Sequence, residues 1–172
     1  RIQGLSLRTT FITGFPGETD DDFEQLVDFV QRHKFERMGV FTYSLEPDTP
    51  AANLPDHVPA DVMEARRERL MQVQQEIAFA HLAEQVGRSV DVILDQPVTG
   101  ERNVWIGRSP ADAPDVDGLV FVTGDQLKLR AGDIVPVEIV ATQEYDLVAV
   151  AAGKPRPRTM PRKQQLAGIG QV

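Results

Sequence analysis

The first half of the chain contains two successive strand–helix patterns, and this repetition constrains the fold more than any other feature. An apolar, β-branched run from Leu5 to Thr13 ends in the loop Gly14–Gly17, and a helical pattern follows from about Thr19. A second apolar run, Met38 to Tyr43, precedes a proline-rich loop and a helix from Asp61 to about Val86. This order predicts two parallel strands with a right-handed crossover.

Two parallel strands do not make a stable sheet, because parallel sheets are covered on both faces and need several strands. We therefore expect the first half, residues 1–86, to be the end of a larger α/β structure. The chain opens with Arg1 rather than Met, which agrees with a start upstream.

Both helices carry recognisable sequence signals. Thr19 and Asp22 predict a capping box at the start of the first helix. The apolar face of the first helix consists of Phe23, Leu26, Val27 and Val30. The expected buried side of the second helix consists of Met63, Leu70, Val73, Ile77 and Ala80. Arg66, Arg67 and Arg69 are most simply a solvated helix face with i,i+4 ion pairs.

The second half, residues 87–150, has no helical period and about five short strands. The strands are expected around Val90–Leu94, Asn103–Gly107, Leu119–Val122, Val135–Ile139 and Tyr145–Val150. Pro136 makes its strand an edge or the site of a bulge. This spacing predicts a small five-stranded barrel of the OB-like kind, so the fold class is α/β followed by all-β.

The last segment, residues 151–172, is rich in proline and basic residues, and we expect a flexible tail. Formal charge is −7 for residues 1–86, −6 for residues 87–150 and +5 for residues 151–172. An acidic body repels phosphate backbones and attracts basic partners. A nucleic-acid contact would have to come from the basic tail or from a basic stripe of Arg102, Arg108, Lys128 and Arg130.

Composition excludes several classes of site. The sequence has no cysteine, so it holds no disulfide, thiolate zinc site or cysteine-ligated iron–sulfur cluster. His33, His57 and His81 have no metal-ligand spacing and are expected to be surface or packing residues, so no metal site is predicted. No apolar run is long enough for a membrane span, and secretion signals are missing, so a cytoplasmic, membrane-free protein is expected.

Two loops are candidates for a binding site. Gly14–Glu18 and Tyr43–Ala51 each follow a strand, and loops at the carboxyl ends of parallel strands form the sites of α/β proteins. The first loop is no Walker motif, and its acidic neighbours argue against a phosphate ligand. On pattern alone, a tight turn with a capped helix is favoured for the first loop and an ordinary polar loop for the second.

These same segments resemble a known family. Arg8–Thr19 and Phe41–Ala51 are similar to the late-barrel strands and loops of radical S-adenosylmethionine methylthiotransferases, although the family commonly has Gly where Asp48 stands. Residues from about Gly87 to Val150 resemble the TRAM domain that ends these enzymes. The stretch Gly107–Gly118 is similar to the RimO branch, which methylthiolates the β-carbon of an aspartate in a small-subunit ribosomal protein.

The resemblance implies the last units of a partial, TIM-like radical SAM barrel followed by a TRAM barrel. The family uses S-adenosylmethionine and two 4Fe–4S clusters, whose cysteine ligands are absent here. No catalytic residue is therefore expected in this chain, which should be inactive alone as the carboxyl-terminal part of such an enzyme.

The resemblance also implies two sets of binding residues. Those expected to bind S-adenosylmethionine are Gly14, Phe15, Pro16, Gly17, Glu18, Tyr43, Ser44 and Glu46. Those expected to bind a basic ribosomal protein are Trp105, Arg108, Asp112, Asp115 and Asp117. Two alternatives stay open: part of a tRNA adenosine methylthiotransferase, or a stand-alone TRAM or OB-like binding module.

Overall fold

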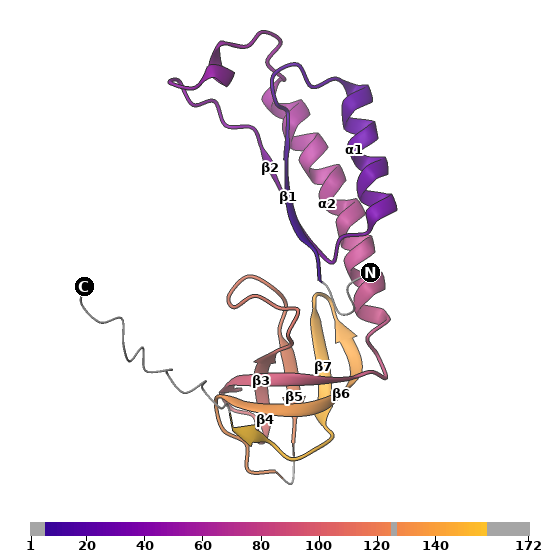
Figure 1. The fold of residues 1–172 in the computed structure, drawn as a ribbon, viewed down its shortest axis with the longest axis vertical. Helices are drawn as coiled ribbons and strands as arrows, with labels where there is room; N and C mark the ends of the chain where they lie inside the picture. Colours follow the sequence, from indigo (N-terminus) through magenta and orange to yellow (C-terminus); the bar gives the residue numbers. More distant parts are fainter. Residues whose placement is uncertain (1–5, 125–126, 158–172) are drawn as a thin grey trace, which may run out of the picture. The chain divides into compact units, whose positions relative to one another are not determined.

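The computed structural model describes residues 6–124 and 127–157 (Figure 1). The chain divides into two compact units, which we call the α/β unit (Arg1–Gln85) and the barrel unit (Val86–Val172). Each unit buries its own set of apolar side chains. Within the described ranges, no helix has the length and apolar character that a membrane crossing requires.

The α/β unit has the predicted strand–helix–strand–helix order. Its elements are β1 (Arg8–Thr13), α1 (Asp20–His33), β2 (Arg37–Thr42), the short 3-10 helix η1 (Pro50–Asn53) and α2 (Ala60–Ala83). β1 and β2 pair in parallel, in register from Arg8 opposite Arg37 to Thr13 opposite Thr42. The prediction of two parallel strands is confirmed.

The start of α1 is fixed by the predicted capping box. The Thr19 hydroxyl accepts a hydrogen bond from the Asp22 amide at 3.2 Å, and the Asp22 carboxylate accepts one from the Thr19 amide at 3.0 Å. These bonds satisfy amides that have no partner within the helix, and Asp20, Asp21 and Asp22 suit the positive end of the helix dipole. The helix ends at His33, and the capping residue Lys34 adopts a left-handed conformation with φ 49°.

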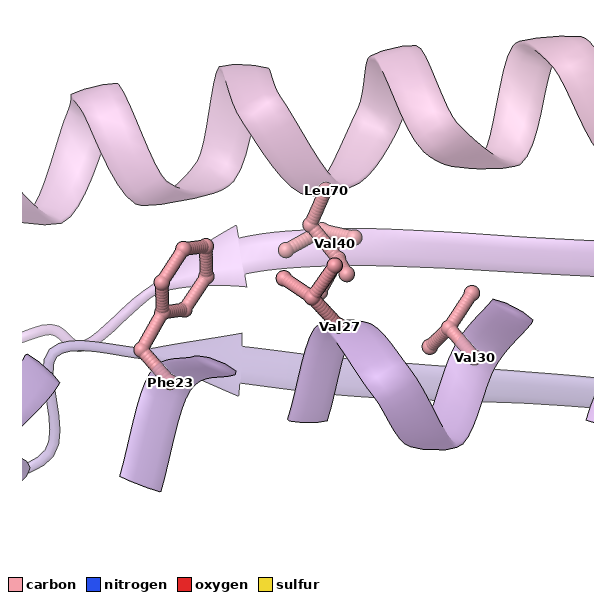
Figure 2. Packing of buried hydrophobic residues seen from close by; sticks show 5 residues of the cluster. All are labelled: Phe23, Val27, Val30, Val40 and Leu70. Carbon is pink, nitrogen blue, oxygen red and sulfur yellow. The ribbon is translucent and has the colours of Figure 1, made fainter. Parts of the chain in front are cut away.

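One face of the β1–β2 pair packs against both helices. Figure 2 shows Leu70 of α2 pointing toward Val27 of α1 and Val40 of β2, with Phe23 and Val30 on either side along α1. On the other face, Ile12 and Phe41 lie opposite each other in register and are 56% and 63% exposed. The α/β unit thus has a dry side under the helices and an uncovered apolar side.

The buried side of α2 differs from the prediction. Its buried residues fall at every fourth position: Arg66, Leu70, Gln74, Ala78 and Leu82. Of these five only Leu70 was predicted, whereas the predicted Met63, Val73 and Ile77 are half-buried and Ala80 is exposed. Apolar periodicity does not find Arg66 and Gln74 because they are polar, and Gln74 Nε2 donates to the Phe35 carbonyl at 2.9 Å. The assignment of Arg66 to a solvated face was wrong, because its charge is paired inside the fold.

The barrel unit is a closed five-stranded barrel with a short sixth strand. The strands are β3 (Ser89–Pro97), β4 (Val104–Arg108), β5 (Val120–Thr123), β6 (Asp133–Gln143), β7 (Asp146–Ala151) and β8 (Arg156–Pro157). The order is β3-β4-β5-β7-β6, and pairing of β6 with β3 closes the barrel. Among the described strands of this unit, β5 and β7 pair in parallel and the other neighbours are antiparallel. The predicted α/β region followed by a small closed barrel is confirmed.

The strand β8 lies in the segment that was expected to be a flexible tail. Arg156 and Pro157 pair with Ile134 and Asp133 of β6, and Ala151 still belongs to β7. The Arg156 guanidinium also contacts the Asp91 carboxylate at 2.6 Å. Ala151, Arg156 and Pro157 therefore belong to the sheet, while residues 158–172 of the predicted tail lie outside the described residues.

The inside of the barrel is lined by alternating residues, as a pleated sheet requires. Its fully buried side chains include Val92, Leu94, Val120, Val122, Val135, Val137, Ile139 and Ala149. The expectation for Pro136 holds, since β6 carries a register shift between Ile139 and Ala141. Pro136 lies opposite Asp91 in the β3–β6 ladder, but its carbonyl accepts from the Ala152 amide at 2.9 Å on the other side of β6. The missing amide therefore faces the point where the partner of β6 changes from β8 to β7.

Candidate functional site

The two predicted loops lie side by side at one end of the β1–β2 pair. Thr13 and Thr42, the last strand residues, are opposite each other, and the Tyr43 amide donates to the Thr13 carbonyl at 2.8 Å. The loops Gly14–Glu18 and Tyr43–Ala51 therefore start from neighbouring points, as the parallel order predicted. Figure 1 shows both leaving the same end of the strands.

Three rings form a small aromatic cluster at these loops. The Phe15 and Tyr43 rings lie 5.5 Å apart edge to face, and the Tyr43 and His57 rings lie 6.3 Å apart. Phe15 is 46% exposed. Sequence spacing did not connect His57 to the site, because only the return of the long loop brings it next to Tyr43.

The hydroxyl of Tyr43 is the most informative atom of this cluster. It is buried, and it has no hydrogen-bond partner among the described residues. A buried polar group without a partner costs about 1–3 kcal/mol, so such groups call for an explanation. A ligand that hydrogen-bonds to this oxygen is one explanation, and it would reach the oxygen only after neighbouring side chains move aside, because the atom has almost no exposed surface.

Ser44 and Glu46 add a polar edge to the site. The Ser44 hydroxyl donates to Glu46 Oε1 at 3.0 Å, and the Thr49 hydroxyl donates to the Glu46 carbonyl at 2.8 Å. Both predicted residues are exposed. Their oxygens are oriented by these local bonds and remain open to the hydroxyl or ammonium groups of a ligand.

The two glycines of the first loop have different reasons to be glycine. A Cβ on Gly14 would lie 2.1 Å from Cγ of Met63, so the close approach made possible there is to α2 and not to a ligand. Gly17 has open space around it, but its φ of +87° disfavours any other residue. The Gly17 amide donates to the Asp56 carbonyl at 2.9 Å, and Pro16 is buried.

Glu18 is held by an arginine that sequence reasoning placed in solvent. Arg66 Nη1 lies 2.6 Å from Glu18 Oε1, and Arg66 Nη2 lies 2.7 Å from Asp20 Oδ1. Burial acts to lower the pKa of Arg66, but the hydrogen bonds with Asp20 and Glu18 outweigh it and hold that pKa above its ordinary value. The Glu18 carboxylate is thus engaged within the fold, unlike Ser44 and Glu46.

The five predicted binding residues of the barrel unit differ in their partners and exposure. The Arg108 guanidinium forms a two-pronged ion pair with Asp95, at 2.7 and 2.8 Å. This hydrogen bonding raises the pKa of Arg108 against an opposing effect of burial, and the charges of Asp115 and Asp112 add to the rise. Trp105 lies in β4 opposite Val122 and is only partly exposed.

The acidic residues of the loop after β4 are mostly turned toward their own backbone. Asp112 accepts hydrogen bonds from the Ser109 amide at 3.0 Å and the Ser109 hydroxyl at 2.6 Å. Asp117 accepts one from the Ala113 amide at 2.7 Å. Asp115 is exposed, with a left-handed φ of 59°. Asp112 and Asp117 stabilise the loop, and Asp115 presents its charge to solvent.

Metal coordination finds no support in the parts of the chain that the structure describes. Residues 6–124 and 127–157 contain no group of three or more histidine, aspartate or glutamate side chains placed to hold a metal ion. The sequence contains no cysteine at all.

Known proteins resemble first the barrel unit and then most of the chain. Residues 86–151 match the family model described as the TRAM domain. A ribosomal protein uS12 methylthiotransferase RimO from a Synechococcus species is 54% identical over 151 residues, which is 87% of this chain and 31% of that protein. The proteins of the same name from Acaryochloris marina and Nostoc are 51% and 49% identical over 82% and 85% of the chain, and 32% of each relative is covered.

The chain is similar to the RimO-type methylthiotransferases, and it contains a TRAM domain. The resemblance predicted from the sequence is confirmed. The chain spans about a third of the length of the RimO relatives it matches. The match of 151 residues is longer than either compact unit, so the similarity to RimO includes both the α/β unit and the barrel.

Proposed function

We propose that this chain is the carboxyl-terminal part of a radical S-adenosylmethionine methylthiotransferase of the RimO type. The reaction is the addition of a methylthio group to the β-carbon of an aspartate in a small-subunit ribosomal protein, in the cytoplasm. The observation that carries the proposal is identity near 50% to proteins of that name, extending over both units.

Iron–sulfur clusters do not fit the residues of this chain. Such clusters are held by cysteine thiolates, and the sequence has none. We therefore derive no step of the reaction through a cluster and propose that these residues alone are inactive. In the proposed enzyme, the cluster ligands belong to residues outside this sequence.

S-adenosylmethionine fits the end of the β1–β2 pair better. In the proposed enzyme, it supplies the radical that abstracts hydrogen from the substrate. Phe15 and Tyr43 offer an aromatic wall, and the Ser44–Glu46 pair offers oxygen acceptors. The buried Tyr43 hydroxyl has no partner among the described residues and would offer a hydrogen bond once the side chains that cover it move. Gly14, Pro16 and Glu18 shape the loop and need not touch the ligand, because their packing and ion pair lie within the fold.

We propose that the barrel unit recognises the substrate protein. Its segment from residue 87 to 150 has a formal charge of −6, which complements a basic ribosomal protein and repels RNA. Asp115 and the partly exposed Trp105 are available for contact, whereas Asp112 and Asp117 support the loop and Arg108 links β4 to Asp95 of β3. Weak RNA contact through the basic tail stays part of the proposal.

A binding experiment with the chain as bait tests this function. Purified ribosomal protein uS12 and bulk tRNA are offered at two salt concentrations, and we expect capture of the protein and not of the tRNA. Asp115→Asn should weaken capture several-fold, because Asn keeps the left-handed backbone and removes the charge. Glu144→Gln is a matched control, since Glu144 is also exposed and has a φ of 52°.

Salt-sensitive capture of tRNA in preference to the protein would contradict this proposal. It would favour the tRNA-modifying branch and show that basic side chains outweigh the acidic total.

A further inference from the structure

Arg66 differs from the other arginines of α2. Only 8% of the Arg66 side chain is exposed, whereas the side chains of Arg67 and Arg69 are 35% and 50% exposed. Arg67 pairs with Glu64 on its own helix, and Arg69 pairs with Glu24 of α1. Arg66 alone of these three contacts the loop between β1 and α1.

The guanidinium of Arg66 contacts both the end of this loop and the start of α1. Its Nη1 donates to the Glu18 carboxylate at 2.6 Å and to the Glu18 carbonyl at 3.2 Å, while Nη2 donates to Asp20 at 2.7 Å. Its central carbon lies 5.5 Å from the centre of the Phe23 ring. A planar fork with several donors can make all these contacts at once, which an ammonium group cannot.

The rest of the loop is held by the same stretch of chain. The Gly17 amide is bonded to the Asp56 carbonyl, Gly14 lies against Met63, and the Thr13 hydroxyl is within 3.3 Å of the Met63 carbonyl. All these partners, like Arg66, come from residues 56–66. The conformation of the first loop is therefore set by Asp56, which precedes α2, and by the first turns of α2.

We propose that Arg66 is a positioning residue of the candidate site. It holds Glu18, and through Glu18 the loop Gly14–Glu18, so that Phe15 stays against Tyr43 in the geometry that binds S-adenosylmethionine. Arg66 does not touch the ligand. This inference rests on the proposed function, since it assigns the same site to the same ligand.

The test uses the full 172-residue chain in four forms: wild type, Arg66→Met, Arg66→Lys and the control Arg67→Met. Amide hydrogen exchange of Gly17 reports the order of the loop, and exchange of Leu70 reports the integrity of α2. Titration with S-adenosylmethionine gives the affinity of each form.

Arg66→Met should make Gly17 exchange about tenfold faster and weaken binding by a similar factor, since hydrogen bonds to charged groups are lost. Leu70 exchange should change much less, because the lost contacts order the loop and not α2. If Arg66 only stabilised the unit, exchange of both amides would increase equally. Arg66→Lys should restore part of both effects, and Arg67→Met should behave as the wild type.

Unchanged Gly17 exchange and affinity in Arg66→Met, with Leu70 still protected, would overturn the inference. If Arg66→Met loses the protection of the Leu70 amide, the Arg66→Lys variant becomes the test. Gly17 exchange and S-adenosylmethionine affinity equal to those of the wild type in Arg66→Lys would then overturn the inference. A wild-type chain that does not bind S-adenosylmethionine contradicts the proposed site instead, and Gly17 exchange then decides on Arg66 alone.

Discussion

The α/β unit and the barrel unit differ in how the edges of their strands are paired. In the barrel, β3 and β6 pair and close the sheet, so each of its five main strands has a neighbour on both sides. In the α/β unit, β1 and β2 pair only with each other among the described residues, and Ile12 and Phe41 are exposed on the uncovered face. Among the described residues, each main strand of the barrel therefore pairs along both edges, whereas β1 and β2 each have one unpaired edge.

This difference bears on how the two units are stabilised. A closed barrel buries its apolar residues and pairs its amides locally, whereas a two-stranded parallel sheet leaves amides and apolar surface exposed. The loops proposed to bind S-adenosylmethionine follow the two strands of this open sheet. We expect the α/β unit to be the less stable unit, with its order depending on α1, α2 and a small core.

The largest expected effect comes from Leu70→Ala. Leu70 is fully buried between α1, β2 and α2, so the cavity should cost the α/β unit about 3 kcal/mol. Urea unfolding followed by helical circular dichroism should shift to lower urea. Fluorescence of Trp105, the only tryptophan, reports the barrel and should not shift.

Leu54→Ala serves as a control for this variant, because Leu54 is 41% exposed. An equal shift of both signals in Leu70→Ala would show that the two units unfold together and would break the comparison.

A smaller effect distinguishes the two loop glycines. Gly14→Ala should destabilise the α/β unit by about 2–3 kcal/mol, because the new methyl group overlaps Met63 and the φ of +80° is strained. Gly17→Ala meets no neighbouring atom and should cost only about 1 kcal/mol. Thermal unfolding of the two variants measures the difference. Equal losses would mean that Met63 moves aside.

The smallest effect is on acid stability. The hydrogen bonds from Thr19 lower the pKa of Asp22 in the folded state below its ordinary value of 3.8. A lowered carboxyl pKa stabilises the folded state above the ordinary pKa, and this contribution is lost as the pH falls through the lowered value. The Asp22→Asn variant should lack this part of the pH dependence of stability. The measurement is the loss of the helical circular dichroism signal as the pH falls from neutral to below 3.8. An unchanged acid transition would contradict the role of the cap.

Local sequence signals predicted the elements well. The capping residues Thr19 and Asp22, the apolar face of α1 and the alternation in the barrel strands each depend on residues a few positions apart. The two-residue strand β8 could not be predicted this way, since nothing in Arg156 and Pro157 themselves indicates pairing with β6.

The candidate site was predicted in outline and not in detail. Strand order placed the loops next to each other, but the burial of Arg66 and the approach of His57 to Tyr43 are contacts between distant parts of the sequence. A charged residue looks solvated until its partners are known. The pairing of Arg66 with Glu18 was not predicted, and a binding role for Glu18 stays a prediction.

Hydrogen exchange of three amides tests the central contrast most directly. Phe11 and Val40 lie opposite each other in the β1–β2 pair, and Val137 lies in β6 between β3 and β7. We predict that the Phe11 and Val40 amides of the 172-residue chain exchange much faster than the Val137 amide, because the open pair unfolds without the barrel. Protection of Phe11 and Val40 equal to that of Val137 would contradict the difference between an open and a closed unit.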